Sequence, residues 1–128
     1  MNYQRHKSEE SVEDYLETIL ILSKQKTQVR SIDVANELGY SKPSVSVAMK
    51  NLRQKNYVLV SEEGYLSLTE AGLKLATTVY ERHSVISNWL ISLGVAREVA
   101  VEDACRMEHD ISEESFAAIK KYLQDAGK

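Results

Sequence analysis

The segment Cys105-Arg106-Met107-Glu108-His109 carries the side chains best suited to chemistry in this chain of 128 residues. On a helix Cys105, Glu108 and His109 share one face, because residues three and four positions apart are neighbours there. They offer a thiolate, a carboxylate and an imidazole. This mixed donor set suits a first-row transition metal better than a hard ion such as calcium. The alternative interpretation is a buried, space-filling cysteine beside a surface Glu–His pair.

Further side chains of the metal-binding type lie on two other predicted helices. Asp14 and Glu17 lie three residues apart in a helix predicted over residues 11–24, so they project from one side of it. His83 lies in a longer helix predicted over residues 70–93. Each has an ordinary explanation as well, since acidic residues favour the first turn of a helix and a single helical histidine is commonly structural. The sequence therefore offers ligands on three helices and leaves their convergence open.

A helix-turn-helix is predicted in the first half of the chain. Helices expected over residues 32–38 and 42–55 are separated by a short turn that contains glycine, Gly39-Tyr40-Ser41. Ser31 and Ser41 are the expected N-caps, and Pro43 fits the first turn of the second helix because no intrahelical N–H bond is lost there.

A β-hairpin and three helices are predicted after the helix-turn-helix. Two segments rich in strand-forming residues, 57–60 and 65–68, flank a tight turn, and together with the helices before them they indicate a winged helix with a two-stranded wing. Helices are then expected over residues 70–93, 99–110 and 113–124. The predicted fold is mainly α, with a winged helix-turn-helix domain over residues 1–79 and an all-helical domain over residues 80–128.

The outer face of the second helix of the helix-turn-helix is suited to DNA. No acidic residue lies between Leu38 and Ser61, and short hydroxyls and lysines on this face suit contacts with phosphates and base edges. Val47 suits contact with a thymine methyl group. The alternative is a solvated basic helix, and Glu62 and Glu63 make the wing tip unattractive to phosphates. The predicted DNA-binding residues are Ser41, Lys42, Pro43, Ser44, Ser46, Val47 and Lys50.

The overall composition is that of an intracellular protein. The net charge is −3, and the single cysteine excludes an intramolecular disulfide framework. The first seven residues are polar and no apolar stretch is long enough for a signal peptide or a membrane span, so we expect a cytoplasmic protein without a membrane partner. The predicted long helix carries more apolar side chains than one small lobe covers, which predicts a homodimer.

Five segments together resemble a known family over nearly the whole chain: Val12-Glu13-Asp14-Tyr15-Leu16-Glu17, Ser41-Lys42-Pro43-Ser44-Val45-Ser46, Leu68-Thr69-Glu70-Ala71-Gly72, Arg82-His83 and Asp103-Ala104-Cys105-Arg106-Met107-Glu108-His109. They are similar to the diphtheria toxin repressor family of metal-dependent transcriptional regulators. The resemblance implies a winged helix followed by a helical dimerisation and metal-binding domain. Larger members add an SH3-like third domain, and from the length of this chain we expect the architecture of the short manganese-regulating branch instead.

The resemblance also implies a set of metal ligands. The manganese branch matches this chain at five ligand positions, namely Asp14, Glu17, His83, Glu108 and His109. Cys105 stands where that branch has glutamate, and cysteine there is typical of the iron-responsive branch, which has methionine at the position of Asp14. Val101 and Ser87 replace two ligands of the iron branch's ancillary site. The expected primary site is Asp14, Cys105, Glu108 and His109, with Glu17 and His83 joining it or completing a second position.

These features predict a regulator, most simply a repressor, that binds double-stranded operator DNA as a homodimer when loaded with Mn(II) or Fe(II) and so controls metal homeostasis. Three alternatives remain open. The first is a winged-helix regulator that senses redox state or another ligand through Cys105. The second is a small metalloenzyme, against which stands the lack of a long substrate loop. The third is a winged helix used only for protein contacts, which the acid-free basic stretch disfavours.

Overall fold

The computed structural model describes the backbone of residues 3–126 and the side chains of residues 11–126. The chain forms two compact units, one of residues Lys7–Thr77 and one that begins at Thr78. The boundary between them falls inside a long helix; the sequence alone placed the domain boundary two residues later, after residue 79. Within the described residues, no helix is long and apolar enough to cross a membrane.

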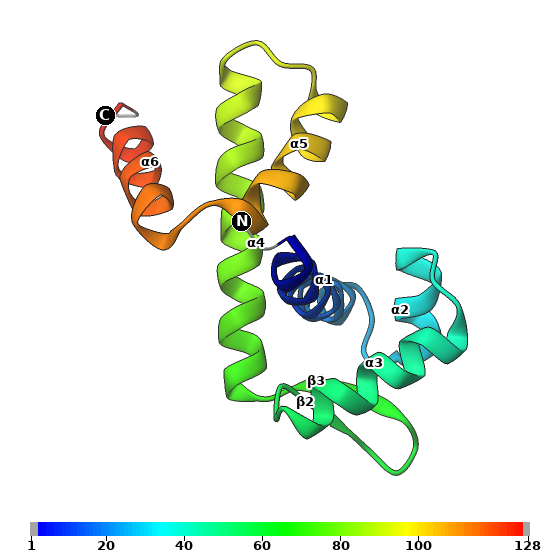
Figure 1. The fold of residues 1–128 in the computed structure, drawn as a ribbon. Helices are drawn as coiled ribbons and strands as arrows, with labels where there is room; N and C mark the ends of the chain where they lie inside the picture. The colour runs from blue at the N-terminus through cyan, green and yellow to red at the C-terminus, as the bar shows by residue number, and fades with distance from the viewer. Residues whose placement is uncertain (1–2, 127–128) are drawn as a thin grey trace. The chain divides into compact units, whose positions relative to one another are not determined.

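The first unit is built on three helices. Helix α1 spans Tyr3–Gln25, α2 spans Ser31–Leu38 and α3 spans Lys42–Gln54 (Figure 1). The predicted first helix therefore begins eight residues earlier than expected, in a polar segment that has no apolar periodicity to announce it. Gly39, with a φ of +71°, ends α2 in the left-handed conformation that favours glycine, and so makes the turn of the helix-turn-helix.

The helix caps agree with the predictions at one position and differ at another. The Ser41 hydroxyl accepts a hydrogen bond from the Ser44 N–H at 3.3 Å and caps α3, as predicted. The prediction for Ser31 was wrong, because Ser31 is the first residue of α2 itself. The Asp33 carboxylate instead accepts the backbone N–H of Arg30, the capping residue, at 2.9 Å.

The wing is a small antiparallel sheet in the order β1-β3-β2. Strand β2 spans Val58–Val60 and β3 spans Tyr65–Leu68, which confirms the predicted hairpin (Figure 1). A third strand, β1 at Val29–Arg30, pairs with β3 and was not predicted. Two residues are too few to show a strand pattern, and β1 forms because the buried Val29 side chain joins the core of the unit.

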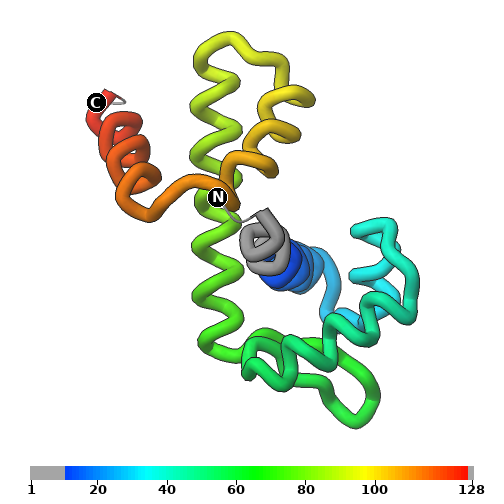
Figure 2. The backbone as a smooth tube through the Cα atoms, in the orientation of Figure 1, coloured from blue at the N-terminus to red at the C-terminus, as the bar shows by residue number. Residues whose placement is uncertain are grey.

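The core of the first unit joins α1, the helix-turn-helix and the sheet. Figure 2 follows the backbone from α3 through the hairpin into the start of α4. The buried apolar residues that make up this core are Leu16, Ile19, Leu20, Leu22, Val29, Val34, Ala35, Val45, Met49, Leu52, Val58, Leu66 and Ala76. Because α1 and α3 both contribute to it, the core fixes the helix-turn-helix on α1.

The second unit consists of helices with a smaller core. Helix α4 spans Glu70–Ser92, α5 spans Arg97–Asp110 and α6 spans Glu113–Ala126. The Thr69 and Ser112 hydroxyls cap α4 and α6 by accepting hydrogen bonds from the backbone N–H groups of Gly72 and Ser115. After α4 the chain reverses and α5 returns beside it (Figure 1). The buried core is Ile86, Ala104 and Phe116, with Val85, Leu90, Met107 and Ile111 packed against it.

Candidate metal centre and nucleic-acid interface

The packing of α5 against α4 determines where the Cys–Glu–His segment lies. Ala100 and Ala104 are fully buried, and their small side chains allow α5 to approach α4 closely. Glu108 follows Ala104 by four residues and therefore lies on the same inner face of α5. Only 1% of its surface is exposed, while Cys105 at the edge of that face is exposed.

Side chains of α4 and α5 meet around this glutamate. The His83 Nδ1 atom lies 3.0 Å from Glu108 Oε2 and 3.6 Å from Cys105 Sγ. The ligand atoms of His83, Cys105 and Glu108 all lie within 4.8 Å of one another. On the other side of the carboxylate, His109 Nε2 lies 3.4 Å from Glu108 Oε1. We refer to these four residues, His83, Cys105, Glu108 and His109, as the Glu108 cluster.

His83 of the Glu108 cluster keeps its proton to high pH when no cation is present. Hydrogen bonds to the Cys105 thiol and the Glu108 carboxylate raise the pKa of His83 to about 10, against a smaller opposing effect of burial. A divalent cation that binds here must therefore displace a proton, so binding to this cluster is coupled to proton release.

The chemistry of the Glu108 cluster fits a divalent transition metal. A buried carboxylate is costly unless paired or coordinated, and two imidazoles and a sulfur surround this one. Nitrogen, oxygen and sulfur donors together suit iron, cobalt or zinc, and the carboxylate and imidazoles also suit manganese. The alternative interpretation, a buried cysteine beside a surface Glu–His pair, is wrong. Glu108 is buried and Cys105 is exposed.

Asp14 and Glu17 lie on α1, in the first unit, three residues apart and half-buried. Between them in sequence, Leu16 is fully buried in the core of that unit. The structure thus brings four of the six predicted ligands together within the second unit. A contribution of Asp14 and Glu17 to the same metal stays a prediction.

Arg82, next to His83, is a residue that the sequence did not single out for a role of its own. Its guanidinium Nη1 donates hydrogen bonds to the carbonyl oxygens of Glu108 at 3.0 Å and of Ile111 at 2.9 Å. Its Cζ lies 5.5 Å from the centre of the Phe116 ring. Arg82 therefore ties the C-terminal end of α5, which carries Glu108, to α4 and to α6. In the sequence Arg82 stands only in the Arg82-His83 segment of the family resemblance, which does not indicate these contacts.

The second candidate site is the outer face of α3. Its apolar side, Val45, Met49 and Leu52, is buried. Val47 on the opposite side is 61% exposed. The predicted DNA-binding residues are all exposed: Ser41, Lys42, Pro43, Ser44, Ser46, Val47 and Lys50.

The wing carries a cation that sequence analysis did not include in the site. The Arg30 guanidinium lies 4.5 Å from the centre of the Tyr65 ring, a cation–π contact across β1 and β3. Gly64, in the turn of the hairpin, has a φ of +87°, and a Cβ there would meet the Arg30 side chain. Glu62 and Glu63 are exposed in the same turn, so the tip of the wing itself is acidic.

Two models of known protein families match this chain. The N-terminal DNA-binding domain of the iron-dependent repressors matches residues 8–66, and their metal-binding and dimerisation domain matches residues 69–127. Together these two matches cover most of the chain and include both candidate sites.

Individual relatives point the same way. The chain is 36% identical over 118 residues to the transcriptional regulator MntR of Escherichia coli O6:H1, covering 92% of this chain and 76% of that protein. It is 30% identical over 114 residues to MntR of Bacillus pumilus, covering 89% of this chain and 79% of that one. The solved structure of the manganese regulator SloR superimposes with a TM-score of 0.78 at 29% identity over 88% of this chain, which spans about half (53%) of that chain. The chain therefore belongs to the iron-dependent repressor family of metal-dependent transcriptional regulators, and within it to the manganese-regulator branch of the diphtheria toxin repressor type.

Proposed function

We propose that this protein is a homodimeric, cytoplasmic repressor that binds operator DNA when loaded with Mn(II) or Fe(II), and thereby controls metal homeostasis. The observation that carries the proposal is the Glu108 cluster, in which a buried carboxylate lies 3.0 Å from the His83 imidazole with an exposed thiol beside it. The winged helix of the first unit supports the DNA-binding half of the proposal. In this proposal residues 1–79 bind DNA, and residues 80–128 form the dimer and bind the metal.

The proposed ligands come from three helices: Asp14, Glu17, His83, Cys105, Glu108 and His109. A bound divalent cation supplies the positive charge that offsets this set of acidic and thiolate side chains. Arg82 orients the end of α5 through its two carbonyl contacts, so the Glu108 carboxylate is held in place before a cation arrives.

Helix α1 is the element that links the two proposed activities. It carries Asp14 and Glu17 on one side, while Leu16 and Ile19 are fully buried in the core that also contains Val45 of α3. A restraint on α1 therefore acts directly on the helix-turn-helix. Metal and DNA binding are then thermodynamically linked, each raising the affinity for the other by the same factor.

The DNA-binding half of the proposal uses the exposed face of α3. In a dimer, two such helices enter successive major grooves about 34–36 Å apart. Lys42 and Lys50 neutralise phosphates, while Ser44, Ser46 and Val47 face base edges. Ser41 and Pro43 begin the helix and bring its N-terminus toward the groove.

The experiment is a gel shift with the DNA upstream of the protein's own gene, in Mn(II), in Fe(II) without oxygen, and in chelator. We expect complexes with either metal and none in chelator. Asp14→Asn should lose the metal-dependent shift, whereas Glu13→Gln, a matched change at the neighbouring position of α1, should retain it. Equal binding with and without chelator would contradict the proposal.

A redox-sensing regulator is the second candidate, and the exposure of Cys105 is the observation that favours it. The two functions separate in the same gel shift. If metal is the signal, Cys105→Ser still binds DNA in Mn(II) and not in chelator, and mild peroxide does not change DNA binding by the wild type at constant metal. If the thiol is the signal, peroxide changes DNA binding by the wild type at constant metal and Cys105→Ser abolishes that response.

A further inference from the structure

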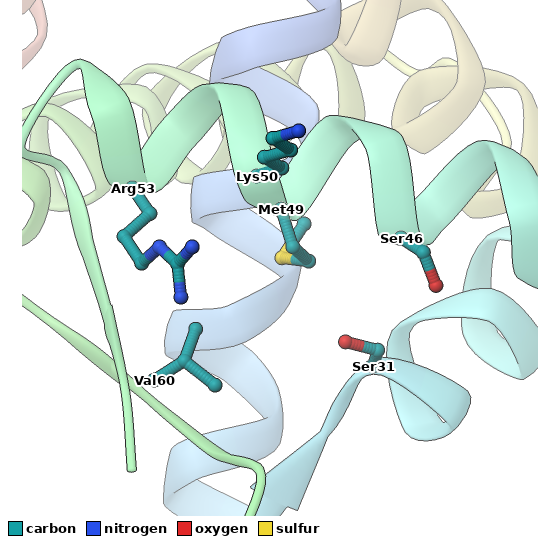
Figure 3. Close-up of a pocket in the computed structure, with 6 residues that line it drawn as sticks. All are labelled: Ser31, Ser46, Met49, Lys50, Arg53 and Val60. Atoms are coloured by element: carbon teal, nitrogen blue, oxygen red, sulfur yellow. The ribbon is translucent and has the colours of Figure 1, made fainter. Parts of the chain in front are cut away.

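A cleft on the first unit lies where α2, α3 and the wing meet. It has a volume of about 250 Å³. Ser31 at the start of α2 and Val60 of β2 form two of its sides, and the remaining lining comes from α3 (Figure 3). The lining residues are Ser31, Ser46, Met49, Lys50, Arg53 and Val60.

The polar groups of this cleft are all of the kind that binds an anion. Arg53 and Lys50 contribute two cations, the hydroxyls of Ser31 and Ser46 can donate hydrogen bonds, and no acidic residue lines the cleft. Figure 3 shows the Arg53 guanidinium reaching toward Val60 of the wing, with the two hydroxyls at the other end of the cleft.

The positive charge of the cleft is not neutralised by the protein. In the part of the chain that the structure describes, neither Lys50 nor Arg53 forms an ion pair. The nearest acidic residue in sequence to Ser31 is Asp33, and its carboxylate is already bound by Lys26 at 2.6 Å and by the backbone of Arg30. Both cations are thus available to a ligand.

We propose that this cleft binds a phosphodiester of the DNA backbone, and that Arg53 is its principal contact. The inference rests on the proposed DNA binding and adds to it a contact that the outer face of α3 does not include. The forked guanidinium of arginine suits the two non-bridging oxygens of a phosphodiester, and short hydroxyls commonly donate to phosphate oxygens as well.

The position of the cleft identifies duplex DNA, rather than a small anion, as the occupant. Ser46 and Lys50 belong both to the cleft and to the exposed face of α3 that is proposed to enter the major groove. A phosphate in the cleft therefore lies at the border of that groove. Because Glu62 and Glu63 make the wing tip repulsive to phosphates, the cleft is also the place where the wing side of the unit can hold the backbone.

Lys55 provides a matched control. It is exposed, lies two residues after Arg53 at the end of α3, and does not line the cleft. Replacing either residue by alanine removes one positive charge from the same end of the same helix. A long-range charge effect thus changes binding equally in both variants, whereas a phosphate held in the cleft distinguishes them.

The test measures fluorescence anisotropy of a labelled random-sequence duplex with the full-length protein in Mn(II) and in chelator, over a series of salt concentrations. Arg53→Ala should weaken binding and reduce the slope of log affinity against log salt by about one unit for each subunit bound. Arg53→Lys should restore most of the slope, and Lys55→Ala should leave it close to that of the wild type. Circular dichroism confirms that each variant is folded.

Two results would overturn the inference: Arg53→Ala and Lys55→Ala change the slope equally, or Arg53→Ala leaves it unchanged. These outcomes are judged in whichever metal condition the wild type binds DNA. The proposed function fails separately, if wild-type binding is the same in Mn(II) and in chelator. A wild type that binds no duplex in either condition overturns both.

Discussion

The two units of this protein differ in the size of their apolar cores and in the polar side chains that they bury. The winged-helix unit buries a large set of aliphatic side chains from both its helices and its strands, and the caps of its helix-turn-helix are formed by its own residues. The second unit has a small core around Ile86, Ala104 and Phe116 and keeps a buried glutamate and a half-buried arginine within it. It also leaves Leu93 and Val99 at least half exposed.

From this difference we expect a bound metal ion and a second copy of the chain to affect the two units unequally. The first unit has a large apolar core of its own, so its proposed partner, DNA, binds to a unit that is already folded. The second unit has charges and apolar surface that a cation and a second copy of the chain can satisfy. Metal binding and dimerisation should therefore stabilise the second unit far more than the first.

The largest effect is expected at Arg82. Arg82→Met removes charge-assisted hydrogen bonds to two carbonyl groups and should lower the free energy of unfolding by about 3 kcal/mol. Arg106→Met, on the exposed side of α5, breaks only surface ion pairs and should cost less than about 1 kcal/mol. Urea unfolding in chelator measures both. Equal losses would show that Arg82 has no special role in the second unit.

The next effect concerns the dimer. Analytical ultracentrifugation in chelator should show a dimer at micromolar protein, and Leu93→Glu should raise its dissociation constant about 100-fold, or about 2.7 kcal/mol. Leu59→Glu, at a comparably exposed leucine of the wing, should leave the dimer intact. A monomeric wild type, or equal sensitivity at the two leucines, would contradict the contrast between the units.

Metal choice should change by about tenfold at Cys105. A thiolate is softer than a carboxylate, so Cys105→Glu should raise the affinity for Mn(II) relative to Co(II) by about that factor. Cys105→Ala should weaken both metals, Co(II) the more. Competition titrations compare the three proteins, and unchanged relative affinities would show that Cys105 only fills space.

The smallest effect tests the self-sufficiency of the first unit. The hydrogen bond from Lys26 and that from the Arg30 backbone lower the pKa of Asp33, so this carboxylate stabilises the fold when ionised. Asp33→Asn should cost about 1 kcal/mol at neutral pH. Because the folded-state pKa is depressed, this contribution is complete above about pH 4 and lost as pH falls through the lowered pKa. Urea unfolding from pH 7 to acidic pH should therefore show the difference between the two proteins shrinking.

The first unit could be predicted from sequence because local signals specify it. Helix starts are marked by the capping hydroxyls of Ser41 and Thr69, and the end of α2 is marked by the left-handed conformation of Gly39. The hairpin follows from its strand-forming and turn-forming residues. The third strand could not be predicted, since Val29 and Arg30 alone show no alternation. Nor could Arg53 be assigned, because the cleft it lines exists only once β2 has folded beside α3.

The metal centre was predictable as a set of residue types but not as a geometry. Helical spacing indicated that Cys105, Glu108 and His109 share a face. It could not reveal that Glu108 is the buried member and Cys105 the exposed one, because that depends on the close packing of Ala104 against α4. The contacts of Arg82 with the α5 carbonyls join residues far apart in sequence and have no local signature.

The most direct test of the central claim is a Co(II) titration of wild type, Glu108→Gln and Glu102→Gln, followed by visible and near-ultraviolet absorption. Glu102 is an exposed acid on the same helix and serves as the control for lost charge. The wild type should show a thiolate-to-cobalt charge-transfer band, Glu102→Gln should keep the band and the affinity, and Glu108→Gln should lose about 100-fold in affinity. If Glu108→Gln binds Co(II) as tightly as the wild type, or no thiolate band appears, the Glu108 cluster is not the metal site and the account is wrong.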